Sequence, residues 1–400
     1  MTYDVAKIRS HFPSLNTGLA YFDGPGGSQV PLVVGAAIAH AITKPISNRN
    51  TNTESEKNAE EYVVGFRQAV GDLIDVDPRG VVYGRSWTQL TYDFSRTLAK
   101  NWGPGDEVVV SRLDHDSNVR PWIQAAEAVG ATIRWAELDT KTTEISVAAV
   151  EAVLSPKTKL VAITGAGNTI GTRPDLKAIG VAVHKVGALF FVDGVHLTPH
   201  AAISVKDIGA DFFGFSFYKL MGPHCAALAA SPALLESLSN DKLLPATSVV
   251  PERFEFGTLP YELMAGCIAA VDFISEMAPG NGVTRREKIV NSMNALEKYE
   301  DELLEYLESS VAALPGVTLY GHAKHRTPTI YFSFAGHNSV DIYKAMALKS
   351  VTLPASNFYA LEVSRALGLG DAGALRAGLA PYSTRDDVDR LIAGLKELTA

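Results

Sequence analysis

The chain has 400 residues, of which 46% are hydrophobic and 20% charged, as in an ordinary globular protein with room for one large and one smaller domain. Its net charge of -8 and the lack of a long basic run argue against a nucleic-acid partner. The first residues have no apolar signal-peptide core, no apolar run is long enough to span a bilayer, and the two cysteines form no CxxC pattern. We therefore expect a cytoplasmic protein without a membrane segment, a disulfide framework or a metal site.

The middle of the chain alternates short apolar runs with helical patterns. Strands are predicted over 106–114, 132–138, 159–167, 188–196 and 208–218, and helices between them over 118–130, 145–155 and 174–187. This rhythm predicts an α/β fold with a mostly parallel sheet that helices cover on both faces. Ligands of such sheets bind beyond the carboxyl ends of the strands, so polar residues that follow these strands are the first candidates for a site.

The pattern changes after residue 262. A helix over 263–278 leads to the break PGNG, and the segments after it are a long helix around 294–314, short strands over 317–322, 327–334, 350–354 and 374–380, and a closing helix over 386–398. We expect a large domain of residues 15–278 and a smaller α+β domain formed by residues 1–14 plus 279–400.

Lys219 directly follows the apolar segment 208–218. It could be an ordinary surface lysine, but the apolar run predicts burial, which lowers the pKa of an amine and makes it a nucleophile able to form a Schiff base. Asp193 ends the apolar run FFVD and could simply cap a turn. Its other interpretation is a carboxylate that pairs with a pyridinium nitrogen. Together, a buried lysine and this aspartate one strand earlier predict a pyridoxal 5'-phosphate site.

Other polar residues follow neighbouring strands. His115 comes after the strand over 106–114 and is either a capping residue or a ring that stacks on a planar ligand, and Asn168 could donate a hydrogen bond to an oxygen on that ligand. Ser86 and Thr88 precede a helical pattern, where hydroxyls and free N–H groups form a phosphate site or, equally, an N-terminal cap.

Two competing motifs are weaker. Residues 216–219 match the S-x-x-K pattern of penicillin-recognising serine enzymes, but the S-D-N and K-T-G elements that these enzymes also need are missing from the sequence. Residues 165–171 have the spacing G-x-G-x-x-x-G instead of the dinucleotide-binding G-x-G-x-x-G, and Pro174 delays the helix that should open inside the loop. We therefore set aside both the serine-enzyme and the Rossmann oxidoreductase interpretations.

Taken together, the sequence resembles the class V aminotransferase family, a branch of the pyridoxal phosphate enzymes of fold type I that includes cysteine desulfurases, selenocysteine lyases and isopenicillin N epimerase. The resemblance extends from Tyr21 nearly to the C-terminus. The segments that carry it, in family order, are YFDGPGGSQVP, DHDSNVRPW, GNTIGT, VDGVH, SFYKLMGP, RFEFGT and RAGLAPYST. It implies the fold type I architecture, with a mostly parallel large domain and a smaller α+β C-terminal domain.

The resemblance also implies a role for each matching residue. Lys219 would form the internal aldimine, Asp193 would pair with the pyridine nitrogen, and His115 would stack over the ring. Further residues implied to bind the cofactor are Asn168 and His196 near the ring hydroxyl, Ser86, Trp87, Thr88 and Ser216 at the phosphate, and Tyr218 beside the lysine.

Three more positions are implied at the edges of the site. Arg376 would pair with the substrate carboxylate, a task that suits a planar guanidinium, and Asn357 would also contact the substrate. Thr258 matches a residue that reaches the phosphate of the neighbouring subunit, so the resemblance implies a homodimer with composite active sites.

One departure from the cysteine desulfurase pattern bears on the expected activity. Desulfurases carry a catalytic cysteine in a loop before the final strand, but the corresponding residues 350–363 contain no cysteine and no arginine. Cys225 and Cys267 lie elsewhere, and small thiols in apolar surroundings usually behave as core residues. We expect an enzyme that acts on a small L-amino acid, a sulfur-containing one among the candidates, through an external aldimine, and ends in amino-group transfer or β-elimination. The alternatives are an amino-acid epimerase, or a cofactor-bearing sulfur-transfer partner without turnover.

Overall fold

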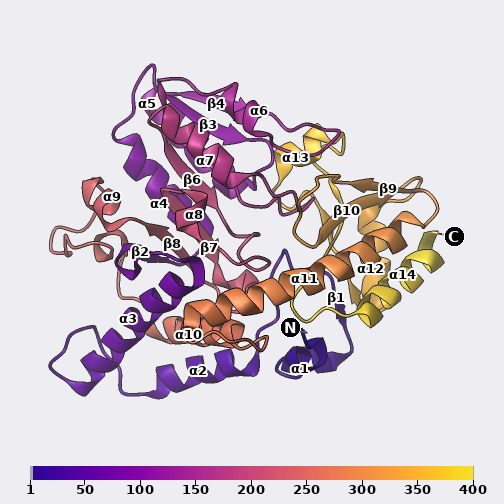
Figure 1. The fold of residues 1–400 in the computed structure, drawn as a ribbon, viewed down its shortest axis with the longest axis horizontal. Coiled ribbons are helices and arrows are strands. Elements are labelled where there is room, and N and C mark those ends of the chain that lie inside the picture. The colour runs from indigo at the N-terminus through magenta and orange to yellow at the C-terminus, as the bar shows by residue number, and fades with distance from the viewer. Residues whose placement is uncertain (1–2, 400) are drawn as a thin grey trace.

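The computed structural model describes residues 3–399 and contains a large sheet and a smaller one (Figure 1). The large sheet has seven strands in the order β2-β8-β7-β6-β5-β3-β4. Its strands are β2 (Val81–Gly84), β3 (Glu107–Ser111), β4 (Thr132–Ala136), β5 (Thr158–Thr164), β6 (Leu189–Asp193), β7 (Phe212–Ser216) and β8 (Ala226–Ala230). Neighbours from β4 to β7 pair in parallel, whereas β8 runs antiparallel to both β7 and β2. The predicted α/β fold with a mostly parallel sheet is confirmed.

Helices cover both faces of this sheet, because successive side chains of each strand point to opposite sides and both sides are apolar. In β6, Phe191 packs with the core that α4 and α5 share, whereas Phe190 and Val192 pack with the core that includes α3, α7 and α10. These helices are α3 (Glu54–Ile74), α4 (Trp87–Ala99), α5 (Arg120–Val129), α7 (Leu176–Lys185) and α10 (Tyr261–Ser275). Both faces of the sheet are therefore covered, and a ligand can approach it only at the ends of its strands.

The smaller sheet is antiparallel and follows the order β12-β13-β10-β9. Its strands are β9 (Val317–Tyr320), β10 (Thr329–Phe334), β12 (Ala355–Ser356) and β13 (Ala374–Gly378), and the helices that share its core are α12 (Ser339–Leu348) and α14 (Arg385–Thr399). Separately, β1 (Ala20–Tyr21) pairs in parallel with β11 (Val351–Thr352) and so brings the start of the chain beside this sheet.

The helix α11 (Arg285–Ala312) connects the two cores. It begins at Thr284, which forms a capping box with Glu287, and in Figure 1 it runs from α10 towards α12 and α14. Ile289 and Met293 pack in the core of the large sheet, while the residues of its second half that pack in the core of the smaller sheet are Leu303, Leu304, Leu307 and Val311. Because α11 and β1 each join the two cores, the division into residues 15–278 and residues 1–14 plus 279–400 stays a prediction.

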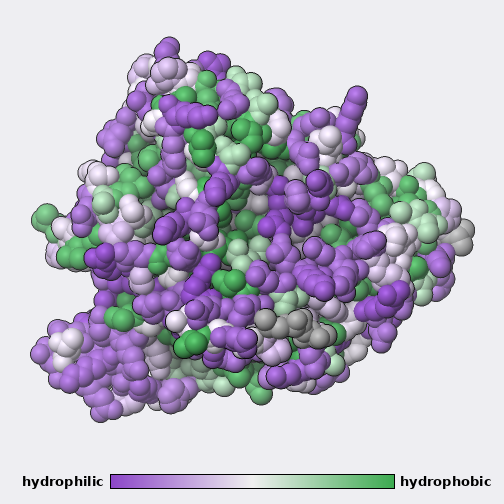
Figure 2. Space-filling model, viewed as in Figure 1, coloured by the Kyte–Doolittle hydropathy of each residue, from purple (hydrophilic) through white to green (hydrophobic). Residues whose placement is uncertain are grey.

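The remaining elements are short or lie at the periphery. The helices are α1 (Val5–Arg9), α2 (Leu32–Thr43), α6 (Val147–Glu151), α8 (Val205–Ile208), α9 (Pro232–Ser237) and α13 (Leu361–Ala366), and the 3-10 turns are Pro13–Thr17, Pro78–Gly80, Asp116–Asn118, Phe217–Lys219 and Glu252–Phe254. Within residues 3–399 we find no helix that combines the length and apolar character needed to cross a membrane. The face drawn in Figure 2 is largely hydrophilic, with hydrophobic side chains in small scattered groups.

Candidate active site

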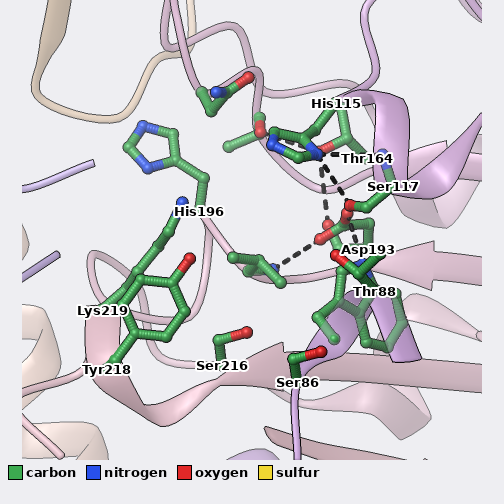
Figure 3. Close-up of a pocket in the computed structure, with 14 residues that line it drawn as sticks. Ser86, Thr88, His115, Ser117, Thr164, Asp193, His196, Ser216, Tyr218 and Lys219 are labelled. Atoms are coloured by element: carbon green, nitrogen blue, oxygen red, sulfur yellow. Dashed lines mark hydrogen bonds between the residues drawn. The ribbon is translucent and has the colours of Figure 1, made fainter. Parts of the chain in front are cut away.

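Residues from several strand ends of the large sheet meet around one chamber of about 470 Å³ (Figure 3). Asp193 is the last residue of β6, Ser216 is the last residue of β7, and Lys219 ends the turn that follows β7. The predicted residues that line this inner chamber are Ser86, Trp87, Thr88, His115, Asn168, Asp193, His196, Ser216, Tyr218 and Lys219, and Ser117, Thr164, Ala166 and Val195 complete it. The structure thus brings together most of the residues that were singled out in the sequence.

Lys219 is buried, with 8% of its surface exposed, and its side chain lines the inner chamber. The pKa of its amine is lowered from 10.5 to about 8, first by burial and then by the positive charge of Arg376, and the carboxylate of Asp193 partly opposes both effects. An amine with this pKa is neutral in a sizeable fraction of molecules near neutral pH, which is the state that attacks a carbonyl carbon.

Asp193 faces the chamber from the opposite side in Figure 3 and is 3% exposed. Its two oxygens accept hydrogen bonds from the Trp87 indole N–H at 2.7 Å and from the Val195 backbone N–H at 2.9 Å. Burial raises the pKa of this carboxyl to about 6, and the two hydrogen bonds limit the rise. Asp193 is therefore mostly ionised at neutral pH and can stabilise a cationic ring nitrogen.

A glycine allows Trp87 to reach Asp193. A side-chain carbon at Gly214, in the middle of β7, would lie 1.9 Å from the Trp87 ring, well inside van der Waals contact. The edge of the indole therefore fills the space that a side chain at Gly214 would occupy, and Trp87 is only 3% exposed. The family resemblance implies that Trp87 lies at the phosphate; in the structure its indole N–H donates to Asp193, and its role at the phosphate stays a prediction.

His115 lines the inner chamber as a neutral ring. Its Nδ1 accepts a hydrogen bond from the Ser117 backbone N–H at 3.1 Å, which leaves the ring proton on Nε2. Burial, together with the positive charges of Lys219 and Arg376, lowers the pKa of His115 to about 3. The ring lies against Tyr359, with a centroid distance of 5.4 Å and an interplanar angle of 29°.

The hydroxyls predicted for the phosphate gather at the beginning of α4. Ser86 is the N-cap of this helix and accepts a hydrogen bond from the Gln89 backbone N–H at 3.1 Å, while Thr88 lies in the first helical turn and Ser216 at the nearby end of β7. The N-cap interpretation of Ser86 is thus present in the structure. It is compatible with anion binding, because the N–H groups of a first turn have no partners within the helix.

Two polar atoms of the inner chamber are buried without a hydrogen-bond partner: Asn168 Oδ1 and His196 Nδ1. The other ring nitrogen of His196 contacts Thr329 Oγ1 at 3.1 Å, and the Asn168 amide donates to the Phe358 carbonyl at 2.9 Å. An unpaired buried polar atom is costly, so these two atoms indicate a polar ligand that pairs with them.

A second, wider chamber of about 1250 Å³ continues outwards from Lys219 and His115. Its outer walls include Asp23, Tyr92, Arg120, Phe358, Tyr359 and Arg376. Arg376, on β13 of the smaller sheet, is 2% exposed and donates to Asp23 at 2.6 Å and to the Asn168 carbonyl at 3.1 Å. The predicted carboxylate-binding arginine therefore reaches the same cavity as Lys219 from the other sheet.

Two predicted residues lie outside these chambers. The amide of Asn357 donates to the Asp371 carbonyl at 2.8 Å, and its oxygen accepts from the Tyr359 backbone N–H at 2.9 Å, so it stabilises a turn and lines neither chamber. Thr258 is exposed and lines a separate pocket with Arg85 and His224. Their predicted roles in substrate and cofactor binding stay predictions.

The two cysteines lie outside the lining of both chambers. Cys225 and Cys267 are buried, line neither chamber, and have their sulfur atoms 3.2 Å apart. Burial, followed by the interaction with Cys225, raises the pKa of Cys267 well above its usual range. Their predicted character as core residues agrees with this environment.

Sequence reasoning missed Asp23, Ser117, Phe358 and Tyr359. Asp23 stands inside the segment YFDGPGG, which carried part of the family resemblance, so its position could have been noted. Phe358 and Tyr359 directly follow Asn357 in the loop that lacks the desulfurase cysteine. Their contacts with Arg376 and His115 join residues far apart in the chain, and no local pattern contains that information.

The fold and this strand-end site are those of a pyridoxal phosphate enzyme of fold type I. The sequence profile of the family "Aminotransferase class-V" matches residues 20–391, and the chain belongs to this family. The predicted resemblance, fold type, enzyme class and cofactor are thereby confirmed.

Two relatives match over nearly their whole length. The chain is 31% identical over its whole length to an uncharacterized protein of Mycobacterium tuberculosis that it also covers completely, and 31% identical to the aminotransferase-like protein FGM3 of Gibberella zeae, with 99% of this chain and 98% of that protein covered. Among solved structures, the cysteine desulfurase CsdA of Escherichia coli matches with a TM-score of 0.88 at 24% identity, with both chains covered completely. At that identity, the match to CsdA establishes a shared fold.

The inner chamber fits the family's cofactor. Its residues offer an amine with a lowered pKa, an ionised carboxylate, hydroxyls beside a helix N-terminus, and two buried atoms that need partners. These groups match the aldehyde, the ring nitrogen, the phosphate and the ring hydroxyl of pyridoxal phosphate in chemical character. The assignment of each residue to its part of the cofactor remains a prediction.

Proposed function

We propose that this protein acts at the α-carbon of a small L-amino acid and ends in amino-group transfer or β-elimination. The bound pyridoxal phosphate supplies an electron sink for the bond that breaks at this carbon. The observation that carries the proposal is the buried amine of Lys219, which shares one chamber with the carboxylate of Asp193 and opens towards the guanidinium of Arg376.

Lys219 holds the cofactor and moves the substrate proton. A general base works best when its pKa lies near the operating pH, and burial brings the pKa of Lys219 to about 8. The neutral amine can accept the proton of the α-carbon and return it to another atom. Asp193, ionised and fixed by Trp87, stabilises positive charge on the ring nitrogen.

Arg376 orients the substrate through its carboxylate. The guanidinium lies in the outer chamber wall and has Asp23 and the Asn168 carbonyl as partners, while its Nε is buried without one. A planar guanidinium with unused N–H groups suits a carboxylate better than a lysine would. Substrate binding at this position leaves the α-carbon on the side of Lys219.

The chain favours elimination over persulfide formation when the substrate is cysteine. Persulfide chemistry needs a thiolate over the cofactor, and the loop 356–359 provides Ser, Asn, Phe and Tyr. Elimination needs no protein thiol: cysteine and one water give pyruvate, ammonia and sulfide. We therefore infer pyruvate, and not alanine, as the carbon product from cysteine.

The central experiment follows the cofactor spectrum of the purified holoenzyme while single amino acids are added, with analysis of the products. We expect a spectral change and an amino-transfer or elimination product with at least one small L-amino acid. Borohydride should attach the cofactor to the peptide that contains Lys219. Lys219→Ala should show neither the spectral change with amino acids nor the attachment of the cofactor by borohydride. The exposed control Lys206→Ala should show both. Racemised substrate alone would identify an epimerase, and no response to any amino acid would support a non-turnover protein instead.

A second experiment tests the fate of sulfur. The holoenzyme is incubated with L-cysteine, and alanine and pyruvate are measured side by side. The same assay is repeated with Cys225→Ser combined with Cys267→Ser. Alanine formed together with a persulfide on either thiol, and lost in the double variant, would overturn the proposed elimination chemistry.

We infer that the protein is a homodimer in which Thr258 completes the site of the other subunit. The exposure of Thr258 and its distance from its own chamber, together with the half-exposed Phe256 beside it, support this arrangement. Mixing Lys219→Ala with Thr258→Ala subunits should restore activity, because one of the two mixed sites then contains both native residues. Monomers in sedimentation at assay concentration would contradict the inference.

A further inference from the structure

The turn before α13 has an unusual backbone. Phe358 and Tyr359 both adopt the left-handed conformation, with φ values of 51° and 60°. For a residue with a bulky side chain this conformation is unfavourable, and two in succession are rare. Strain of this kind persists where surrounding contacts fix the backbone, and it concentrates at functional sites.

The contacts that fix this turn come from both sheets. The Tyr331 hydroxyl donates to the Ser356 carbonyl at 2.8 Å from the smaller sheet. From the large-sheet side, the Asn168 amide donates to the Phe358 carbonyl at 2.9 Å, and the Asp116 backbone N–H donates to the Tyr359 carbonyl at 2.7 Å. The two strained residues therefore each hold one hydrogen bond across the chamber.

The side chains of this turn contact two residues of the candidate active site. The Arg376 guanidinium lies 3.7 Å from the centre of the Phe358 ring, and the Tyr359 ring stacks on His115. Both rings line the outer chamber. A cation over an aromatic face is attracted most strongly when water is excluded, and Arg376 is 2% exposed.

We propose that Phe358 is a positioning residue that fixes Arg376 for substrates with a free carboxylate, and that the left-handed turn at Tyr359 holds Phe358 in that place. The inference rests on the proposed role of Arg376 and adds what determines its selectivity. Asp23 binds the guanidinium by charge, and the Phe358 ring packs on the face of the guanidinium. Together these contacts restrict the group to one orientation. Loss of the ring leaves the guanidinium held only by Asp23 and the Asn168 carbonyl.

The first measurement compares two probes that differ only in the carboxylate. L-alanine and L-alaninamide are titrated into the holoenzyme, and the ratio of their apparent Kd values gives the carboxylate preference. We expect Phe358→Leu to reduce this preference about tenfold, the order expected for a buried cation over a ring. Phe358→Tyr keeps the aromatic face and should keep the preference. An unchanged ratio in Phe358→Leu, or an equal loss in both variants, would overturn the proposal.

The second measurement does not depend on amino-acid binding. Phenylglyoxal modifies accessible arginines, and peptide mapping reports its rate at Arg376 alone. We expect the rate to rise several-fold in Phe358→Leu and to stay at the wild-type value in Phe358→Tyr. No response of the wild-type protein to either alanine probe would count against the proposed function, while the rates at Arg376 would still decide this inference.

The third measurement separates strain from stability. Tyr359 is 72% exposed, so its removal loses little packing, and glycine adopts the left-handed conformation freely. Tyr359→Gly should melt at the wild-type temperature or above it, and Tyr359→Ala should melt below Tyr359→Gly. Because glycine also has access to other backbone conformations, Tyr359→Gly holds the turn less strictly, and its carboxylate preference should fall although its stability does not. A preference that simply follows the melting temperature across the variants would refute the positioning role.

Discussion

The inner and outer halves of the candidate site are built in different ways. The inner chamber consists of residues at the ends of neighbouring strands of one sheet, and Asp193 and Lys219 are its centre. The outer wall combines Tyr92 and Arg120, from helices of the large sheet, with the beginning of the chain and two segments near its end, at Asp23, Phe358 and Arg376. In the proposed function, the first half provides the chemistry and the second recognises the substrate. Changes in the inner half should therefore affect kcat and cofactor binding, whereas changes in the outer half should affect KM.

The largest effect should come from Asp193→Asn. An amide cannot stabilise a protonated ring nitrogen, so we expect kcat to fall about 10²- to 10³-fold, the usual cost of removing a central electrostatic contact. Steady-state kinetics on the best substrate, with the cofactor spectrum, would measure this loss. The exposed Asp207→Asn serves as the control and should be unchanged. A variant with native kcat and raised KM would break the proposed division between the two halves.

Lys219 should destabilise the protein when the cofactor is removed. Its pKa falls from 10.5 in the unfolded chain to about 8 in the fold, so the unfolded state binds more protons between these values, and the free energy of unfolding rises with pH there. Below pH 8 the buried charge costs about 3 kcal/mol. Cofactor-free Lys219→Met should therefore be more stable than the wild type at pH 7, and the difference should shrink as the pH rises from 8 to 10.5. Urea titrations at several pH values would show a constant difference if the amine were solvated.

Gly214→Ala tests the support beneath the inner chamber. The added methyl group meets the buried Trp87 ring at 1.9 Å, and overpacking of this kind costs about 1–3 kcal/mol. The displaced indole would also weaken its hydrogen bond to Asp193. Thermal melting and cofactor affinity should both decrease. Gly35→Ala is the matched control, since nothing lies within 4 Å of its added carbon and α2 favours alanine.

The smallest effect should come from Glu362→Gln at the outer wall. Glu362 accepts hydrogen bonds from Arg112 at 2.9 Å and Arg120 at 2.7 Å and so ties α13 to the large sheet. Its loss should cost about 1 kcal/mol, raise KM a few-fold and leave kcat unchanged. Steady-state kinetics would check this. Glu397→Gln, which removes an exposed ion pair with Lys349, serves as the control. A fall in kcat would show that the outer wall takes part in the chemical step and would contradict the proposed division between the two halves.

The same division explains what could be predicted from the sequence. Lys219 and Asp193 each follow an apolar run that is itself a strand, so burial and position were readable from neighbouring residues. The turn at Phe358 and the contact of Arg376 with Asp23 depend on how β12 and β13 pair and on where β1 lies, which no local pattern specifies. The strand β8 was not among the predicted strands, because its short run of small apolar residues has no pattern that distinguishes a strand from a helix.

The helix α11 has a consequence for how the chain folds while it is being synthesised. Its 28 residues make a rod about 42 Å long, and the stripe of Leu303, Leu307 and Val311 on its second half is covered by residues that leave the ribosome later. A nascent or truncated chain that ends after α11 exposes this apolar stripe, although the large sheet is already complete. Such intermediates are natural clients of chaperones and proteases. The apolar stripe of α11 is therefore fully covered only when the residues of the smaller sheet have been added.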